Sequence, residues 1–175
     1  MKVLEKLKKN WAGTDTPFLI QNNDNLKFSD LDQKSHFEKN KIQQGDVVAL
    51  IGDFNIQTIS TLLHLIDMNV IVVPLTKETR YQHEYFFEVA LVDVIIENNH
   101  LKKVVHNKKN KLIDTLRNKK RAGLILFSTG TTGLPKAILH DFTMFLEKFE
   151  TPRPSLRALS FLLFDHIGGI NTLLH

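Results

Sequence analysis

The sequence contains no cysteine and only one tryptophan. The lack of cysteine excludes disulfides, thiolate metal sites and cysteine nucleophiles. Long apolar runs are also missing, because no stretch reaches the roughly 18 apolar residues that a membrane-spanning helix needs. The first ten residues, MKVLEKLKKN, have neither the apolar core nor the small-residue cleavage site of a signal peptide. A folded cytoplasmic protein is therefore the default expectation.

The composition is that of an ordinary globular protein. Of the 175 residues, 42% are hydrophobic and 24% are charged, which suits a folded domain with its own core. No internal repeat is visible in the sequence. We accordingly treat residues 1–175 as one unit.

The positive charge is concentrated in residues 102–121. This segment has nine lysines or arginines and one acidic residue, Asp114, whereas the rest of the chain has 14 basic and 18 acidic residues. Such a segment would suit the phosphates of a nucleic acid. We favour a solvated linker with a short helix around residues 112–118, because no aromatic side chain lies between the charges to stack on bases.

Strand-like and helix-like stretches alternate along most of the chain. Residues 47–51 and 70–75 are apolar, β-branched runs typical of strands covered on both faces. Between them, apolar residues recur at the spacing of one helix face: Ile56, Ile59, Leu63 and Ile66. Further strands are predicted at 91–97, 123–128 and 137–140, and further helices at 77–90 and 141–150. The alternation predicts an α/β fold with a largely parallel sheet and flanking helices.

Several details of this prediction concern single side chains. In the helix at 77–90 we expect these residues to face inward: Tyr81, Tyr85 or Phe86, and Val89. Residues 18–28 resemble a hairpin around an Asn/Asp-rich turn, and a helix should open at Ser29 with Asp32 as its capping partner. Its continuation to residue 44 has few apolar residues on any face, so we expect it to lie mostly in solvent.

Residues 128–136, STGTTGLPK, form a polar loop between two apolar runs. Gly130 and Gly133 would let the backbone approach a ligand closely, and four hydroxyls add donors: Ser128, Thr129, Thr131 and Thr132. With the charge of Lys136, this combination suits a ligand that carries several phosphates. It is not a Walker loop, because Pro135 and Ala137 flank the lysine. The alternative from composition alone is a plain polar turn.

These nine residues closely resemble the phosphate-loop signature of the adenylate-forming enzymes, the superfamily of acyl-CoA synthetases, luciferases and peptide-synthetase adenylation domains. Residues 45–75 also resemble that family's first strand-helix-strand unit, and residues 161–175 (FLLFDHIGGINTLLH) fall where the family lines its acyl pocket. The resemblance implies that residues 1–175 are the N-terminal part of an AMP-dependent synthetase/ligase domain, with 102–121 as a variable segment.

The resemblance also implies a chemistry. The family uses ATP to convert a carboxylic acid, such as a fatty or aryl acid, into its acyl-adenylate and then passes the acyl group to an acceptor such as CoA or a carrier protein. By position, residues 128–133 would wrap the β- and γ-phosphates, and Lys136 would hold the leaving pyrophosphate. Magnesium is expected with ATP, but no residue of this chain can be named as its ligand.

The segment around Asp165 and His166 bears on the substrate. His166 with Gly169 resembles the acyl-CoA synthetase form, in which this stretch, Gly168 included, borders the acyl pocket. Phe164 and Asp165 resemble the amino-acid form, in which the aspartate holds the amino group, although Ile167 replaces the expected serine. The acyl form fits better. A structural alternative is that Asp165 caps a helix near Gly168 and His166 is a packing residue.

The later family motifs, which hold adenine, ribose and the mobile C-terminal domain, have no counterpart in these 175 residues. We therefore expect a fragment of an acid–thiol ligase that is inactive or nearly so alone. An amino-acid adenylation fragment, a non-catalytic phosphate-binding module and a nucleic-acid binder are the alternatives.

Overall fold

The computed structural model describes residues 3–31, 37–128, 133–149, 151 and 157–174. Its centre is a six-stranded sheet with the strand order β6-β5-β3-β4-β7-β8, and a separate hairpin pairs β1 with β2. The strands of the main sheet are β3 (Val47–Ile51), β4 (Ile71–Leu75), β5 (Val94–Glu97), β6 (His100–Lys103), β7 (Gly123–Phe127) and β8 (Ala137–Asp141). This arrangement confirms the α/β prediction.

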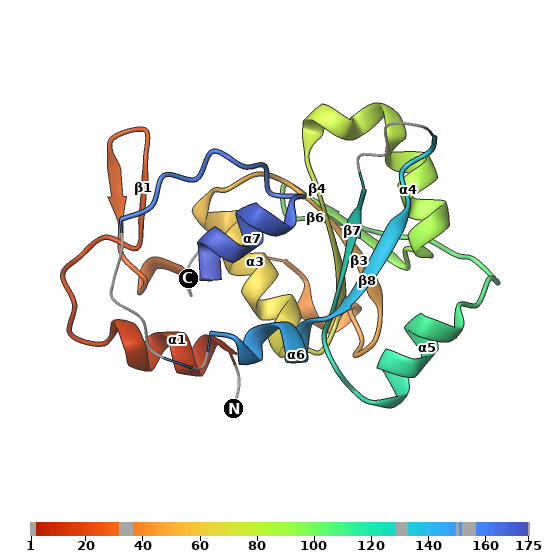
Figure 1. Ribbon diagram of the computed structural model, residues 1–175, viewed down its shortest axis with the longest axis horizontal. Helices are drawn as coiled ribbons and strands as arrows, with labels where there is room; N and C mark the ends of the chain where they lie inside the picture. The colour runs from red at the N-terminus through yellow and green to blue at the C-terminus, as the bar shows by residue number, and fades with distance from the viewer. Residues whose placement is uncertain (1–2, 32–36, 129–132, 150, 152–156, 175) are drawn as a thin grey trace.

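Helices cover both faces of the sheet (Figure 1). On one face, α3 (Ile56–Asp67) packs with α1 (Val3–Trp11), α6 (Phe142–Glu147) and α7 (Ile167–Leu174). On the other lie α4 (His83–Ala90) and α5 (Lys111–Asn118). Alternate residues of β3 therefore enter two different cores, and every residue of β3 and β4 is buried. This double burial explains their continuous apolar sequences.

The sheet is parallel only in its middle. The pairs β5–β3, β3–β4 and β4–β7 are parallel, whereas β6 and β8 run antiparallel at the two edges. The sequence did not predict β6, whose residues (HLKK) are mostly exposed and polar. The turn that forms it is Asn98-Asn99, with φ values of 48° and 66°. Asparagine tolerates this left-handed conformation, which a two-residue hairpin turn requires.

The helix predicted after β3 is confirmed. Asn55 caps α3, because its side chain accepts a hydrogen bond from the N–H of Thr58 at 2.9 Å. Ile59, Leu63 and Ile66 are buried, as the spacing predicted, and Ile56 is half-buried. The carboxylate of Asp67 at its end accepts from the backbone N–H of Val3, at 2.6 Å, and so ties α1 to α3.

The stretch at 77–90 differs from its prediction. It starts as a 3₁₀ helix, η2 (Lys77–Gln82), and becomes α-helical only from His83. Because a 3₁₀ helix has three residues per turn, its side chains do not continue the apolar face of α4. Phe86 faces the core as expected, but Tyr81 is 83% exposed and Val89 is also exposed, so those two predictions are wrong.

The N-terminal hairpin is confirmed, with strands β1 (Leu19–Gln21) and β2 (Asp24–Leu26) around Asn22-Asn23. The helix predicted up to residue 44 is not continuous. Asp30 and Leu31 are helical, but the described residues 37–44 contain only the short 3₁₀ helix η1 (Lys39–Lys41). Most of residues 37–44 are exposed, as predicted, whereas Phe37 and Ile42 are both 5% exposed. Apolar residues at irregular spacing were buried by tertiary contacts rather than by one helix face. The capping role of Asp32 lies outside the described residues.

The basic segment contains the predicted short helix, α5, which Asn110 caps. Ile113 and Leu116 are the buried residues of this helix. Three of the nine basic residues form ion pairs with acidic residues elsewhere in the fold: Lys108 with Glu88, Arg117 with Asp93 and Arg121 with Asp141. Among the described residues, none of the helices combines the length and apolarity that crossing a bilayer demands.

Candidate functional site at the carboxyl edge of the sheet

The four parallel strands end at one edge of the sheet, and two of the predicted site residues, Ser128 after β7 and Asp165 beside the end of β4, lie there. The chain leaves β3 toward α3 on one face, and it leaves β4 toward α4 on the opposite face. Adjacent strands whose connections diverge in this way form a crevice at their carboxyl ends, where open α/β sheets bind ligands. The loop 128–136 follows β7, the neighbour of β4 on its other side.

The two ends of this loop are joined to each other. The N–H of Ser128 donates to the carbonyl of Lys136 at 3.0 Å, and the N–H of Lys136 donates to the hydroxyl oxygen of Ser128 at 3.1 Å. The hydroxyl of Tyr85 in α4 donates to the carbonyl of Pro135 at 2.9 Å. The loop is therefore closed at its neck and fastened to the helix beside it.

The centre of the loop is not described. Thr129, Gly130, Thr131 and Thr132 lie outside the described residues, so their phosphate-binding roles stay predictions. Gly133 and Lys136 are both exposed. A Cβ added at Gly133 would meet nothing within 4 Å. Packing among the described residues therefore does not require glycine at this position.

The structure places Asp165 at the end of β4, where sequence analysis had identified no partner for it. The hydroxyl of Thr76, which is 1% exposed, donates to Oδ2 of Asp165 at 3.2 Å. The Oδ1 atom is buried without a hydrogen-bond partner among the described residues, and Nε2 of His166 is 4.0 Å away from it. Among the described residues, Asp165 makes this bond to Thr76 and no capping bond to α7. A buried carboxylate oxygen without a donor suits a donor on a ligand.

His83 supports this cluster from α4. Its Nε2 atom is 3.0 Å from the carbonyl oxygen of Thr76, so this nitrogen carries the proton and donates. Burial lowers the pKa of His83 below its ordinary value of 6.5, because a buried imidazolium loses its hydration. Sequence reasoning missed both Thr76 and His83, since neither belongs to a recognisable motif and the bond from Thr76 to Asp165 spans 89 positions.

The two glycines of α7 differ in their surroundings. A Cβ at Gly169 would lie 2.5 Å from the carbonyl oxygen of Leu163 and 2.9 Å from the ring of Phe54. A Cβ at Gly168 would meet only the side chain of Leu162, at 2.4 Å. Gly169 therefore has a packing role, whatever it contributes to a substrate pocket.

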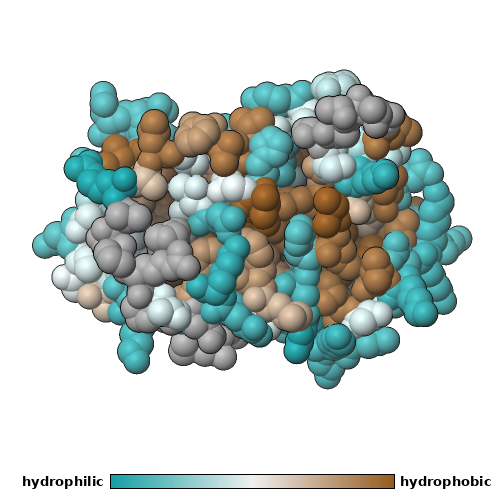
Figure 2. Space-filling view, in the orientation of Figure 1, coloured by the Kyte–Doolittle hydropathy of each residue, from teal (hydrophilic) through white to brown (hydrophobic). Residues whose placement is uncertain are grey.

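The segment before α7 carries exposed apolar side chains. Leu159 is 84% exposed and Phe161 79% exposed. Figure 1 shows this segment crossing between the β1–β2 hairpin and α7, and Figure 2 shows apolar residues gathered in the same upper part of the face. An apolar surface of this kind is typical of a binding site or an interface.

Metal ligands do not gather in the described part of the chain. No group of three or more histidine, aspartate or glutamate side chains is arranged there to hold an ion. The expectation of magnesium with ATP is not tested by this finding.

No protein-family model and no curated protein matches this sequence. Solved structures do match, and we give three. The luciferase-like enzyme from the nonluminescent Zophobas morio mealworm is 18% identical with a TM-score of 0.67, over 98% of this chain and 50% of that one. The o-succinylbenzoate CoA synthetase from Bacillus subtilis, in complex with its acyl-adenylate intermediate, is 16% identical with a TM-score of 0.65, over 97% and 51%.

The third is the Klebsiella oxytoca NpsA N-terminal subdomain in complex with anthranilyl-AMSN, which is 20% identical with a TM-score of 0.60, over 86% of this chain and 43% of that one. The chain thus has the fold of the N-terminal part of adenylate-forming enzymes, as its resemblance to that family implied. It spans about half the length of the structures that it matches.

Proposed function

We propose that this chain is the N-terminal part of an enzyme that uses ATP to activate a carboxylic acid as its acyl-adenylate. The observation that carries the proposal is the loop 128–136, whose sequence resembles the phosphate-loop signature and which follows β7, closed between Ser128 and Lys136. The shared fold of the matched structures supports it.

In this proposal the loop holds the triphosphate. The hydroxyl and backbone donors of residues 128–133 bind the β- and γ-phosphates, and the Lys136 ammonium group stabilises the charge that develops on the leaving pyrophosphate. Magnesium would accompany ATP. CoA or a carrier protein is the expected acceptor of the acyl group, in a cytoplasmic reaction of fatty-acid or aryl-acid metabolism.

Asp165, His166, Gly168 and Gly169 would border the acid. In the main proposal, His166 and the glycines line an acyl pocket. The unpaired Oδ1 atom of Asp165 favours a second candidate, an acid that carries an amino group, because an ammonium or amine would satisfy this buried oxygen. This candidate corresponds to the amino-acid adenylation alternative.

Calorimetric titration of the chain with ATP and with pyrophosphate tests the loop. We expect Lys136→Ala to weaken both affinities by roughly tenfold, the effect of losing one charge-assisted hydrogen bond. Lys119→Ala is the matched control, because it removes the same charge from an exposed position directly after α5. Equal affinities for Lys136→Ala and the unaltered chain would refute the phosphate role. We expect little or no ATP–pyrophosphate exchange by this chain alone.

A further inference from the structure

A hollow lies at the carboxyl edge of the sheet, and none of the residues that line it belongs to the loop 128–136. Its volume is about 200 Å³, and its walls come from the ends of β3 and β5 and from the loop after β4. The polar residues that line it are Asp53, Asn55, Gln57, Thr58, Thr61, Lys77, Glu78, Asn98 and Asn99. It therefore occupies the crevice between the diverging connections of β3 and β4, whereas the loop stands on β7.

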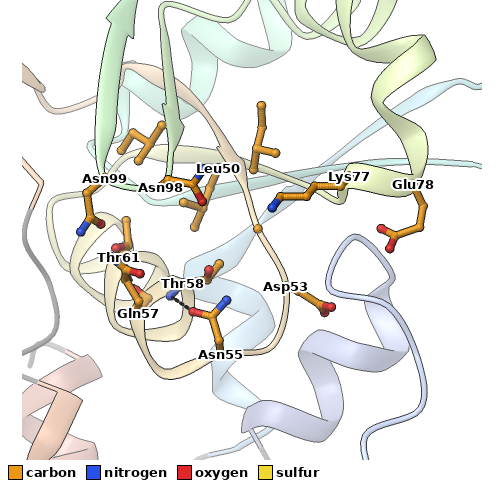
Figure 3. Close-up of a pocket in the computed structure, with 13 residues that line it drawn as sticks. Leu50, Asp53, Asn55, Gln57, Thr58, Thr61, Lys77, Glu78, Asn98 and Asn99 are labelled. Atoms are coloured by element: carbon orange, nitrogen blue, oxygen red, sulfur yellow. Dashed lines mark hydrogen bonds between the residues drawn. The ribbon is translucent and has the colours of Figure 1, made fainter.

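The positive charge among the residues that line this hollow comes from Lys77, and Asp53 and Glu78 supply two carboxylates. Figure 3 shows the side chain of Lys77 extending into it toward Asn98, with the carboxylates of Asp53 and Glu78 turned away from the ammonium group. Oδ1 of Asp53 already accepts from the N–H of Phe54, at 2.7 Å. Among the described residues, Lys77 has no ion-pair partner. Its positive charge is therefore available to a ligand.

Uncharged donors surround this charge. The amides of Gln57, Asn98 and Asn99 line the hollow, together with the hydroxyl of Thr61. Each amide offers two N–H donors and one acceptor oxygen. One cation together with several amide donors matches the oxygens of a phosphate or a carboxylate better than it matches an apolar molecule.

The walls that present these groups are held firmly. A Cβ at Gly52 would come within 2.4 Å of the Thr58 hydroxyl oxygen, so the end of β3 lies tightly against the first turn of α3. Asn98 and Asn99 are fixed in the two-residue turn between β5 and β6. The backbone that carries these donors is therefore in place before any ligand arrives, which lowers the entropic cost of binding.

We propose that this hollow binds the oxyanion group of a small molecule, a phosphate or a carboxylate, through Lys77 and the amides of Gln57, Asn98 and Asn99. The site is distinct from the phosphate loop, and it does not depend on the proposed ligase activity. A chain that failed the test of Lys136 could still bind an anion here.

Two-dimensional NMR of the isotope-labelled chain tests this site, with inorganic phosphate and acetate as separate probes. We expect saturable shifts of the side-chain amide signals of Gln57, Asn98 and Asn99 with at least one probe. Phosphate alone would identify a phosphate site, acetate alone a carboxylate site. If the Lys136→Ala variant shows the same shifts as the unaltered chain, the binding takes place in this hollow and not at the loop 128–136.

The Lys77→Gln variant keeps a side chain of similar length without the charge. We expect this variant to bind the probe that gives saturable shifts about tenfold more weakly, because a charge-assisted hydrogen bond is lost. Lys39→Gln, another exposed lysine, should leave the affinity unchanged. Lys77 is exposed, so thermal unfolding of the variant should match that of the unaltered chain. The absence of saturable shifts with both probes, or equal affinity in Lys77→Gln, would overturn the proposal.

Discussion

Substituting the two adjacent glycines of α7 separately tests the packing at the candidate site. In Gly169→Ala, the added methyl group would lie 2.5 Å from the backbone oxygen of Leu163. This oxygen belongs to the backbone next to the buried Phe164, so it cannot move aside as the end of a flexible side chain could. Overpacking of this kind costs about 1–3 kcal/mol. Replacing glycine by alanine within a helix returns about 1 kcal/mol. The difference is a net loss of up to about 2 kcal/mol in the free energy of unfolding, and we expect Gly169→Ala to be less stable than the unaltered chain.

Gly168→Ala is the matched control in the same helix. Its methyl group would meet only Cδ1 of Leu162, the end of a flexible side chain that is 38% exposed and can turn away. We expect the stability of this variant to equal or slightly exceed that of the unaltered chain. Urea unfolding at 25 °C, followed by circular dichroism, measures both. A Gly169→Ala chain as stable as Gly168→Ala would show that the close approach of α7 to Leu163 has been misjudged.

Two further predictions concern a cap and a buried histidine. Asn110→Ala removes the side-chain oxygen that accepts from the N–H of Leu112 at 2.9 Å, and should destabilise α5 by about 1 kcal/mol in urea unfolding; an unchanged midpoint would contradict the capping role. Because the pKa of His83 is lowered in the folded chain, its stabilising contribution is complete above pH 6.5 and is lost as the pH falls below that value. The drop in stability between pH 7.5 and 5.5 should thus be smaller in His83→Gln, and an equal drop would refute the assignment.

The elements that the sequence predicted well are those whose apolar pattern has one explanation. The β-branched runs of β3 and β4 suit only a strand covered on both faces, and the spacing in α3 suits only one helix face. By contrast, β6 forms through backbone pairing with β5. Its side chains are mostly polar, so the sequence has no apolar pattern that predicts this strand. Tyr81 was misplaced because the change from 3₁₀ to α-helix at His83 leaves no mark in the hydrophobic pattern.

The residues of the candidate site also fall into those that the sequence predicted and those that it did not. The loop 128–136 was found because its residues are consecutive, so the whole arrangement can be seen in the sequence. Thr76 and Lys77 were missed because their partners come from distant parts of the chain. The hydroxyl of Thr76 reaches Asp165 across 89 positions, and Lys77 faces asparagines of the β5–β6 turn. Only the folded structure brings these groups together.

The closed neck between Ser128 and Lys136 has a consequence for how this protein can change. The ladder between β7 and β8 and the two bonds at the neck hold the ends of the loop together, so its attachment to the sheet is set by residues outside positions 129–135. A residue inserted in this loop would therefore lengthen it while the paired strands keep their register.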